Sequence, residues 1–265
     1  MIKVCVAGAT GNVGSILAKE INNSPLFSLT EAISKSNAGK NLGEIINEPD
    51  INLTLKGDVE ELGNKSVDVL IDYTTPSSVK RNVETAISKG TNVVIGTSGL
   101  SDTDYEEINE LALRNKVGAF AAGNFSITSA LMQYFAKIAA KHIDTWEIID
   151  YAPDTKVDAP SGTTRELSFE LSKIKKPSWR VPIESNIGLR ESRGAELNGS
   201  QIHSIRVPGF YSSSEIIFGL DGEKLTLRHD SISYKPYVQG TLLAASKVVE
   251  FIGLKRGIIS LLDIL

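Results

Sequence analysis

The first 121 residues alternate short apolar runs with amphipathic segments, and this alternation restricts the fold more than any other feature. Strand-like runs occupy 2–7, 29–34, 67–72, 92–95 and 117–121, and helical spacing of apolar residues marks 12–21, 77–89 and 103–114. Repeated strand–helix–strand units of this size indicate a parallel sheet covered by helices on both faces. The sequence therefore predicts an α/β, doubly wound domain at the amino end.

After an amphipathic helical segment at 124–142, consecutive strands dominate the pattern. Strand-like segments fall at 145–151, 201–207, 215–220 and 224–229, with one helix over 163–174 and a long loop over 176–200. The Asp221-Gly222 dipeptide is typical of a hairpin turn. These segments predict a second domain with a mixed or antiparallel sheet, and helical spacing returns over 237–252.

Composition excludes several classes of protein. The 265 residues carry a formal charge of −4 without a basic block, which argues against nucleic-acid or anionic-membrane partners. No apolar run reaches the roughly 20 residues of a membrane helix. Cys5 is the single cysteine, so we expect a cytoplasmic protein without disulfides. His142, His203 and His229 are scattered, and no metal site is expected.

A glycine-rich loop, "VAGATGNVG", joins the first strand to the first helix. Gly8, Gly11 and Gly14 let the backbone turn tightly and let a pyrophosphate approach the helix N-terminus. At this junction the spacing predicts a dinucleotide cofactor, and the alternative is a tight turn in a fold that binds none.

The end of the second strand, "EAISKSN", is expected to contact the adenosine ribose. Ser34 and Lys35 stand at the strand tip, whereas Glu31 comes too early to act as the carboxylate that selects NAD. A cation without a carboxylate favours NADPH and leaves NADH possible. The alternative for Lys35 is a solvated loop lysine.

Two further loops follow strands of the same sheet and are expected to line the same crevice. "DYTTPSS" (72–78) contains Thr74, and "GTSG" (96–99) contains Gly96 and Thr97, whose amides and hydroxyls suit a nicotinamide. A third loop, "YAPDTKVDAPSGT" (151–163), places Lys156 before a Ser-Gly-Thr turn. It is either an ordinary strand-to-helix loop or an anion site for a small substrate.

These motifs resemble those of the 4-hydroxy-tetrahydrodipicolinate reductases (dihydrodipicolinate reductases) of bacterial lysine biosynthesis. The resemblance covers nearly the whole chain, and "NFSI" followed by "KVDAPSGT" is its most specific part. It implies a Rossmann-like cofactor domain of residues 1–124 and 235–265, and a domain of residues 125–234 that binds a small dicarboxylate substrate and assembles a homotetramer.

The resemblance also implies roles for individual residues. It assigns Gly8, Gly11, Asn12 and Val13 to the pyrophosphate, Ser34 and Lys35 to the adenosine ribose, Thr74 to the cofactor crevice, Gly96, Thr97, Ala122, Asn124 and Phe125 to the nicotinamide, and Lys156, Ser161, Gly162 and Thr163 to the substrate. The last assignment agrees with the affinity of helix N-termini for carboxylates.

The chain departs from the family pattern at three places. Ala152 and Pro153 replace the usual His-His pair, whose first member is the presumed proton donor. Asn12 stands where Arg or Lys is common, which weakens the NADPH prediction, and "SSSEII" (212–217) replaces a Gly-Glu-His segment.

The proton donor is therefore open. Lys156, the phenol of Tyr151 and water are the candidates, with Lys156 leading. Asp154 and Asp158 would keep Lys156 charged, so a role in binding a substrate carboxylate is equally compatible with the sequence.

Three hypotheses for function follow. The first is NAD(P)H-dependent reduction of 4-hydroxy-tetrahydrodipicolinate to tetrahydrodipicolinate. The second is a paralog that reduces another cyclic imine or carboxylated unsaturated substrate, and the third is a cofactor-binding protein with impaired catalysis. Short-chain dehydrogenases share the glycine loop but need Tyr-x-x-x-Lys, which this sequence lacks.

Overall fold

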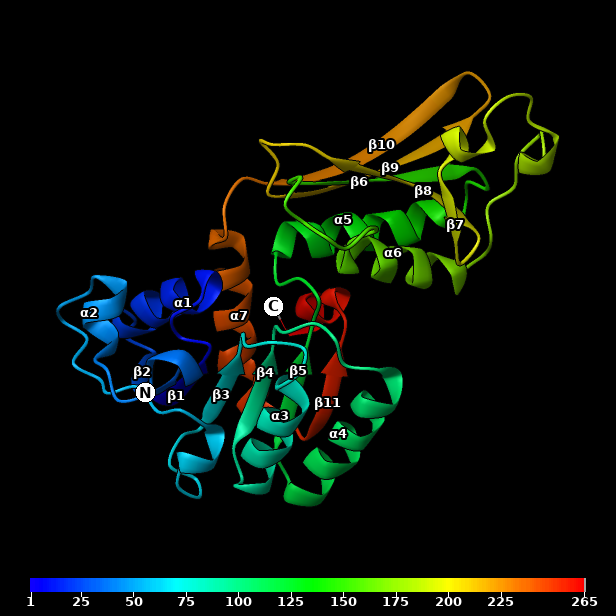
Figure 1. The fold of residues 1–265 in the computed structure, drawn as a ribbon. Helices are drawn as coiled ribbons and strands as arrows, with labels where there is room; N and C mark the ends of the chain where they lie inside the picture. Colours follow the sequence, from blue (N-terminus) through cyan, green and yellow to red (C-terminus); the bar gives the residue numbers. More distant parts are fainter. Residues whose placement is uncertain (265) are drawn as a thin grey trace. The chain divides into compact units, whose positions relative to one another are not determined.

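The computed structural model describes residues 1–264, and they form two compact units (Figure 1). Unit 1 contains residues 1–126 and the chain from residue 234 onward, and unit 2 contains residues 127–233. Unit 2 is thus inserted into the sequence of unit 1.

Unit 1 is built on a six-stranded parallel sheet with the order β11-β5-β4-β3-β1-β2. Its strands are β1 (Ile2–Ala7), β2 (Phe27–Ile33), β3 (Val69–Asp72), β4 (Asn92–Ile95), β5 (Gly118–Ala121) and β11 (Gly253–Arg256). Its helices are α1 (Asn12–Asn22), α2 (Leu42–Ile46), α3 (Val79–Ser88), α4 (Asp102–Asn115) and α7 (Lys235–Lys247), with 3-10 turns at Lys35–Asn37, Val59–Glu61, Val248–Glu250 and Ile258–Ile264.

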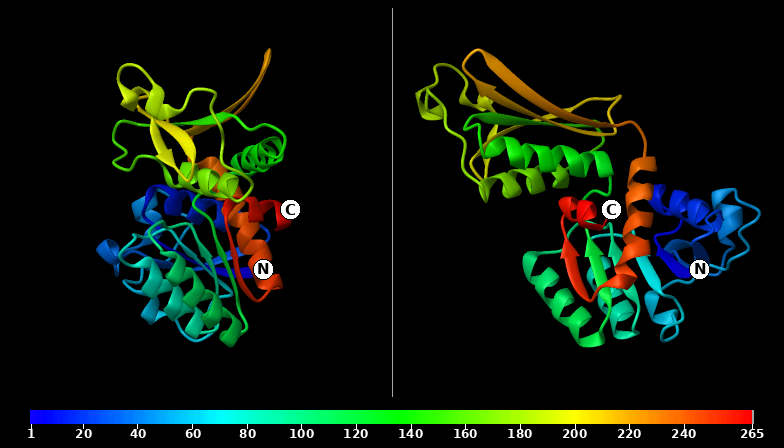
Figure 2. Two further views of the ribbon diagram at one scale, coloured as in Figure 1. Left: turned by 90° about the vertical axis from the view of Figure 1, so that its right-hand side faces the viewer. Right: turned by 180° about the vertical axis from the view of Figure 1, so that it is seen from behind.

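Helices cover both faces of this sheet. Helices α3 and α4 pack together on one face, and α1 and α7 pack together on the other (Figures 1 and 2). Every residue of β3 and β5 is buried, as expected for central strands of a parallel sheet. Ser101 and Asp104 form the expected capping box at the start of α4. The predicted doubly wound α/β architecture is confirmed.

Unit 2 is built on a five-stranded mixed sheet with the order β10-β9-β6-β8-β7, in which only β6 and β8 are parallel. Its strands are β6 (Trp146–Ala152), β7 (Ala195–Leu197), β8 (Ser200–Arg206), β9 (Ser212–Leu220) and β10 (Glu223–Ser231), and its helices are α5 (Ile127–Ala140) and α6 (Gly162–Ser172), with 3-10 turns at Ile183–Ser185 and Arg190–Arg193.

One face of this sheet carries the core of unit 2. Along β6, Trp146, Ile148, Asp150 and Ala152 are buried, while the alternate residues are half-buried on the other face. Trp146 packs against Phe218 of β9 with a ring separation of 5.7 Å. Helices α5 and α6 complete this core.

Three elements differ from the sequence prediction. The last helix ends at Lys247 and not at 252, because the chain turns and then adds β11 beside β5. The short strand β7 lies within the segment predicted as a long loop, and α2 was not predicted. The missed elements β7, α2 and β11 are short, so their residues carry too few repeats to define a period.

None of the helices in residues 1–264 is long and apolar enough to cross a membrane.

Candidate active site

The glycine loop follows β1, the strand at which the order of strands in the unit 1 sheet changes direction. β1 pairs with β2 on one side and β3 on the other, so the loops after β1 and β3 diverge at the carboxyl edge of the sheet. Gly8 has φ +80°, and a Cβ there would lie 2.2 Å from the carbonyl oxygen of Tyr73. A Cβ on Gly14 would lie 2.1 Å from the carbonyl oxygen of Gly8. Both positions therefore require glycine.

The first turn of α1 fits a pyrophosphate. Gly11 is the N-cap and makes no side-chain capping bond, and the first turn contains no acidic residue. The N–H groups of Asn12 and Val13 have no intrahelical acceptor, because they belong to the first helical turn. Free N–H groups and the positive end of the helix dipole favour an anion at this point.

The tip of β2 presents a cation beside a hydroxyl cluster. The Ser34 hydroxyl is buried and lies 2.8 Å from the hydroxyl of Thr10, while Lys35 is exposed at the strand tip. Glu31 is bound to Lys56 at 2.8 Å, partly buried within the sheet. The carboxylate nearest in sequence is therefore already neutralised, which is consistent with a site for a 2′-phosphate.

The loops after β3 and β4 pack against each other at the same edge. A Cβ on Gly96 would lie 2.2 Å from the ring of Tyr73, so this glycine makes room for the tyrosine. The Tyr73 hydroxyl lies 2.7 Å from that of Thr241, and burial raises the pKa of Tyr73, so the phenol stays protonated. The hydroxyls of Thr74 and Thr97, one from each loop, both donate to Asp72 Oδ1.

The segment after β5 contributes buried side chains to this edge. Ala122, Asn124 and Phe125 are all buried, and the Asn124 side-chain oxygen accepts a hydrogen bond from the Ser126 N–H at 2.8 Å. The Phe125 ring lies 6.3 Å from that of Tyr73. All the predicted cofactor residues thus follow carboxyl ends of strands in one sheet.

In unit 2, the loop between β6 and α6 is held by a buried ion pair. Asp150 of β6 has 1% exposure, and its Oδ2 accepts hydrogen bonds from Arg206 Nη2 at 2.7 Å and from the Ser161 N–H at 2.9 Å. Arg206 Nη2 also donates to the carbonyl of Asp158 at 2.8 Å. Burial alone raises the pKa of Asp150, but the bonds from Arg206 and Ser161 outweigh it and leave the pKa below its usual range.

The start of α6 forms an open cradle. Ser161 is the N-cap, and its side chain accepts a hydrogen bond from the N–H of Thr164 at 3.3 Å. Gly162 has nothing within 4 Å of the position where a Cβ would stand, and the Thr163 side chain is buried. The backbone of 162–163 therefore borders free space at a helix N-terminus, as a carboxylate site requires.

Lys156 lies in the same loop as this cradle. Its ammonium group is 2.7 Å from Asp158 Oδ1, and its side chain is 34% exposed. The same residue, Asp158, is fixed through its carbonyl by Arg206. The loop therefore presents a partly exposed cation whose partner is a neighbouring carboxylate.

Tyr151 lies on the other face of the sheet from Asp150. Its hydroxyl donates to Glu215 Oε2 at 3.1 Å, and the guanidinium of Arg228 lies 4.7 Å from its ring centre. Burial and the neighbouring carboxylate of Glu215 raise the pKa of Tyr151, which makes it a weaker acid.

Ala152 is buried at the end of β6, and neither it nor Pro153 has a titratable side chain.

His203 is bonded to Glu147 at 2.7 Å on the sheet face away from the helices. His229 is buried on β10, and desolvation lowers its pKa. Strand register places both His229 and Asp150 opposite Ser214 of β9. The structure thus adds a histidine to the polar row of Asp150, which sequence spacing could not reveal.

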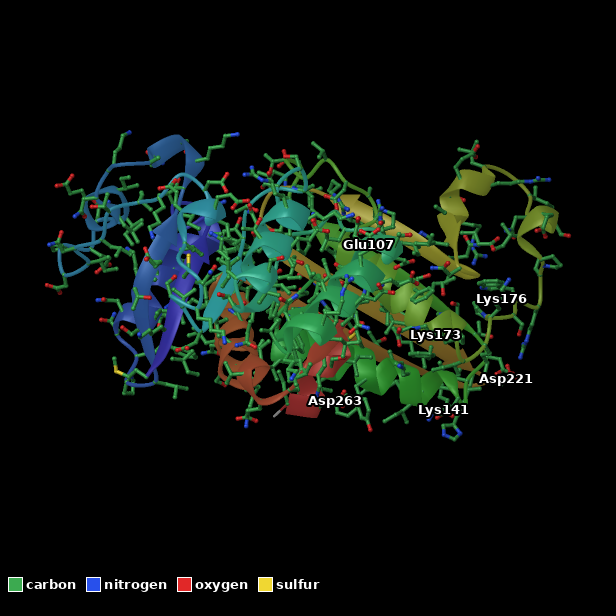
Figure 3. All side chains as sticks on the ribbon, turned by 90° about the horizontal axis from the view of Figure 1, so that it is seen from below. Glu107, Lys141, Lys173, Lys176, Asp221 and Asp263 are labelled. Carbon is green, nitrogen blue, oxygen red and sulfur yellow. The ribbon has the colours of Figure 1, made fainter. Side chains whose placement is uncertain are left out.

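The other end of unit 2 is a charged surface away from this loop. Figure 3 shows Lys141 and Lys173, which follow α5 and α6, at the same end of the unit as Asp221 in the β9–β10 turn. Because α6 begins at the cradle and runs toward this end, these charges are not part of the site.

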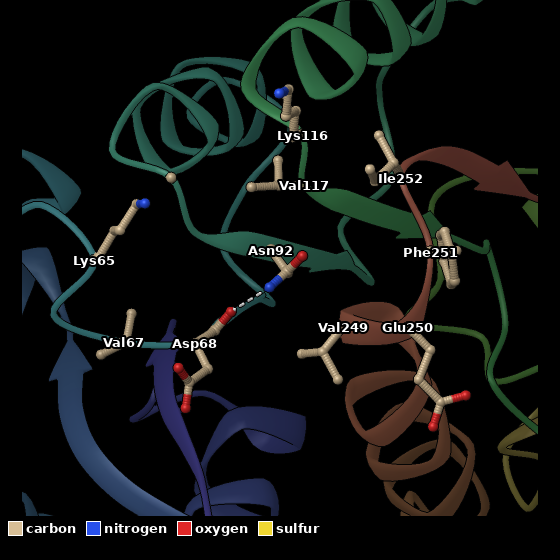
Figure 4. A pocket seen from close by; sticks show the side chains of 11 residues that line it. Lys65, Val67, Asp68, Asn92, Lys116, Val117, Val249, Glu250, Phe251 and Ile252 are labelled. Atoms are coloured by element: carbon tan, nitrogen blue, oxygen red, sulfur yellow. Dashed lines mark hydrogen bonds between the residues drawn. The ribbon is translucent and has the colours of Figure 1, made fainter.

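A pocket of about 470 Å³ lies at the opposite edge of the unit 1 sheet (Figure 4). Asp68, Asn92 and Val117, which line it, stand at or just before the amino ends of β3, β4 and β5. Ligands of open α/β sheets bind at the carboxyl ends of strands, so this pocket is not the candidate cofactor site. In residues 1–264, no cluster of His, Cys, Asp and Glu could hold a metal ion.

Comparison with known proteins identifies relatives along the whole chain. Residues 2–125 match the family model "Dihydrodipicolinate reductase, N-terminus", and residues 126–265 match "Dihydrodipicolinate reductase, C-terminus". The 4-hydroxy-tetrahydrodipicolinate reductases of Desulfitobacterium hafniense and Geobacillus kaustophilus are each 36% identical to this chain, with 99% of both chains covered.

Solved structures agree with these matches. A dipicolinate-bound dihydrodipicolinate reductase from Paenisporosarcina sp. TG-14 superposes with a TM-score of 0.81 and 29% identity, covering 98% of this chain and 99% of that one. An amine dehydrogenase from Mycobacterium smegmatis, at TM-score 0.66 and 16% identity over 96% and 94% of the two chains, shares the fold alone. The chain therefore belongs to the dihydrodipicolinate reductase family of NAD(P)H-dependent oxidoreductases.

Proposed function

We propose that this protein reduces 4-hydroxy-tetrahydrodipicolinate to tetrahydrodipicolinate with NAD(P)H, in lysine and diaminopimelate biosynthesis. The observation that carries this function is the full-length family match together with a cradle at Ser161–Thr163 that suits a carboxylate. The related reductase whose solved structure is bound to dipicolinate supports a dicarboxylate ligand for this protein.

Unit 1 would hold the cofactor, which supplies the hydride. The glycine loop and the N–H groups of Asn12 and Val13 would bind the pyrophosphate, and the loops containing Thr74, Gly96 and Thr97 would border the nicotinamide with the segment 122–125. Lys35 is exposed, and the carboxylate of β2, Glu31, is already paired with Lys56. Lys35 would therefore bind the 2′-phosphate, which would make NADPH the preferred cofactor.

Unit 2 would hold the substrate. Ser161, Gly162 and Thr163 would bind one carboxylate, and Lys156 would exchange Asp158 for a second one. Lys156 is also the leading proton donor, because the Tyr151 phenol is bonded to Glu215 on the other sheet face and has a raised pKa. Water is the remaining candidate, since Ala152 and Pro153 provide no acid.

A second function, reduction of a different cyclic imine or carboxylated unsaturated substrate, is favoured by one observation. The position of the family's presumed proton donor is the buried methyl group of Ala152, so the site differs where the substrate is protonated. A cofactor-binding protein with impaired catalysis would share this feature.

An assay separates these functions. Purified protein would be mixed with NADPH or NADH and enzymatically generated 4-hydroxy-tetrahydrodipicolinate, and cofactor absorbance would be followed. Turnover well above that of Lys156→Ala supports the first function. Turnover only with another imine supports the second, and NADPH binding without oxidation by any imine supports impaired catalysis.

We further propose a cytoplasmic homotetramer assembled through unit 2. The sheet face of unit 2 away from α5 and α6 carries half-buried side chains such as Ile149 and Tyr151, which another subunit could cover. Sedimentation should give four times the chain mass of 28.6 kDa.

A further inference from the structure

A buried carboxylate lies beneath the loops that follow β3 and β4. Asp72, the last residue of β3, is 1% exposed. Its Oδ1 accepts hydrogen bonds from the Thr74 N–H at 3.0 Å, the Thr74 hydroxyl at 2.7 Å and the Thr97 hydroxyl at 2.7 Å. Its Oδ2 accepts one from the Asn82 side-chain amide at 2.9 Å.

These bonds join three separate elements of unit 1. Thr74 belongs to the loop after β3, Thr97 to the loop after β4, and Asn82 to α3. In residues 1–264, no ion pair reaches Asp72, so hydrogen bonds alone compensate for the burial of its charge. Burying a carboxylate costs free energy. A buried carboxylate whose hydrogen bonds are all made holds its donors in a geometry that a neutral side chain could not.

As the donors are oriented, a carboxylate satisfies all four of them. The Asn82 amide also donates to the Thr74 hydroxyl at 3.3 Å, and it would lose that bond if it turned over to accept from a neutral side chain at position 72. An asparagine at position 72 would accept at one atom but would place its NH₂ group against the Asn82 NH₂ group or against the threonine hydroxyls. The donors that lose their acceptor would then be buried and unsatisfied, which frees the two threonine loops to move.

We infer that Asp72 is a positioning residue that holds Thr74 and Thr97 in place for the nicotinamide end of the cofactor. This inference rests on the proposed function, because it takes the carboxyl edge of the unit 1 sheet as the cofactor site. Asp72 acts through the two threonines and touches no cofactor itself, which agrees with its burial. The glycine loop and the β2 tip, which would bind the rest of the dinucleotide, are held by other contacts, such as the Thr10–Ser34 bond.

The test compares a whole dinucleotide with a fragment that lacks the nicotinamide. Binding of NADPH and of 2′,5′-ADP would be measured by calorimetry for the wild type, Asp72→Asn and Asp68→Asn. The control Asp68→Asn makes the same chemical change at the amino edge of the same sheet, where Asp68 is exposed and bonds the Lys3 N–H.

We expect Asp72→Asn to weaken NADPH about tenfold or more, as for a lost charged hydrogen bond, and to leave 2′,5′-ADP within about twofold. Asp68→Asn should change neither affinity. The exchange variant Asp72→Asn/Asn82→Asp, which restores complementary groups at the two positions, should recover most of the NADPH affinity.

Equal weakening of NADPH and 2′,5′-ADP by Asp72→Asn would overturn the inference, because it would show a general loss of structure. Unchanged NADPH affinity would overturn it as well. Failure of the wild type to bind either NADPH or NADH would instead refute the proposed function, so the two failures are distinguishable.

Discussion

Two buried aspartates shape the loops of the two units in the same way. Asp72 stands at the end of β3 and Asp150 near the end of β6, and each is 1% exposed. Each accepts a hydrogen bond from a backbone N–H of the chain that follows its strand, Thr74 and Ser161 respectively. Asp150 differs in having Arg206 as a cationic partner.

Stability should therefore depend on pH through Asp150. Its pKa is lowered in the folded protein, so its contribution is fully present above the unfolded value of about 3.9 and is lost as the pH falls through the folded pKa. We would measure the free energy of unfolding by urea between pH 7 and about pH 3 for the wild type and Asp150→Asn. The variant should be less stable than the wild type at neutral pH, and the difference between their free energies of unfolding should shrink in acid. Asp104, Glu170 and Asp230 also have lowered pKa values, so the difference between the two proteins is the relevant measurement. A gap that is independent of pH would contradict this role.

Lys35 should determine the choice of cofactor. Lys35→Ala removes an exposed cation at the β2 tip and should weaken NADPH by roughly 1.5–3 kcal/mol, with little effect on NADH. Fluorescence titration of both cofactors measures this difference. Lys65→Ala, which removes an exposed lysine of unit 1 near the amino edge of the sheet, is the matched control. Equal losses for NADPH and NADH would refute Lys35 as the phosphate ligand.

Single residues were predictable from sequence where their role is local. Gly8, Gly11 and Gly14 define a turn within one short segment, and the structure shows that turn. The role of Asp72 was not predictable, because two of its partners, Asn82 and Thr97, come from elements that only folding brings to β3.

At the scale of elements, two helices have an exposed glycine at their amino ends. α1 has Gly11 as its N-cap, and α6 has Gly162 as its first residue. Gly11 lies in the loop after β1 of unit 1, and Gly162 ends the loop after β6 of unit 2. Each helix therefore begins near the carboxyl end of a strand in the sheet of its own unit. An anion can therefore approach the backbone closely at either helix.

Gly162→Ala should separate binding from stability. A methyl group there meets no atom within 4 Å, and alanine suits a helix better than glycine, so the free energy of unfolding should be unchanged or slightly higher. The methyl group would occupy the space in front of the cradle, and KM for the substrate should rise about tenfold or more, with the affinity for NADPH unchanged. Steady-state kinetics and thermal unfolding test both parts. An unchanged KM would exclude this cradle as the carboxylate site.

Sequence patterns predicted long elements better than short ones. The helix over 102–115 was predicted closely because its capping box and apolar spacing agree. The strand β11 was missed because Val249 and Ile252 continue the helical spacing of α7, although the helix ends at Lys247. What ends the helix is the pairing of β11 with β5, a long-range contact that local propensity does not report.

At the scale of the whole molecule, the returning segment is built into unit 1. A Cβ on Gly240 of α7 would lie 1.7 Å from the carbonyl oxygen of Phe125, so this helix packs directly on the chain after β5. A Cβ on Gly118 of β5 would lie 2.0 Å from the carbonyl oxygen of Val248. Unit 1 is therefore incomplete without the residues that follow unit 2 in the sequence.

Gly240→Ala should destabilise unit 1 by about 1–3 kcal/mol or more, because backbone must shift to admit the methyl group. Gly219→Ala, where nothing lies within 4 Å, is the control and should have a small effect. Calorimetry in the presence and absence of NADPH would show whether the loss belongs to unit 1, the unit proposed to bind the cofactor. Equal unfolding temperatures for the two variants would contradict the packing of α7 described above.

The insertion of unit 2 into unit 1 has a consequence for synthesis on the ribosome. Residues 127–233 are contiguous, so unit 2 can close as soon as they have emerged. Unit 1 cannot complete its fold until α7 and β11 are translated, and until then one edge of β5 is unpaired. Unit 1, whose first strands precede unit 2 in the sequence, is thus finished after it, and a nascent chain arrested before β11 exposes an edge of β5 that β11 covers in the folded structure.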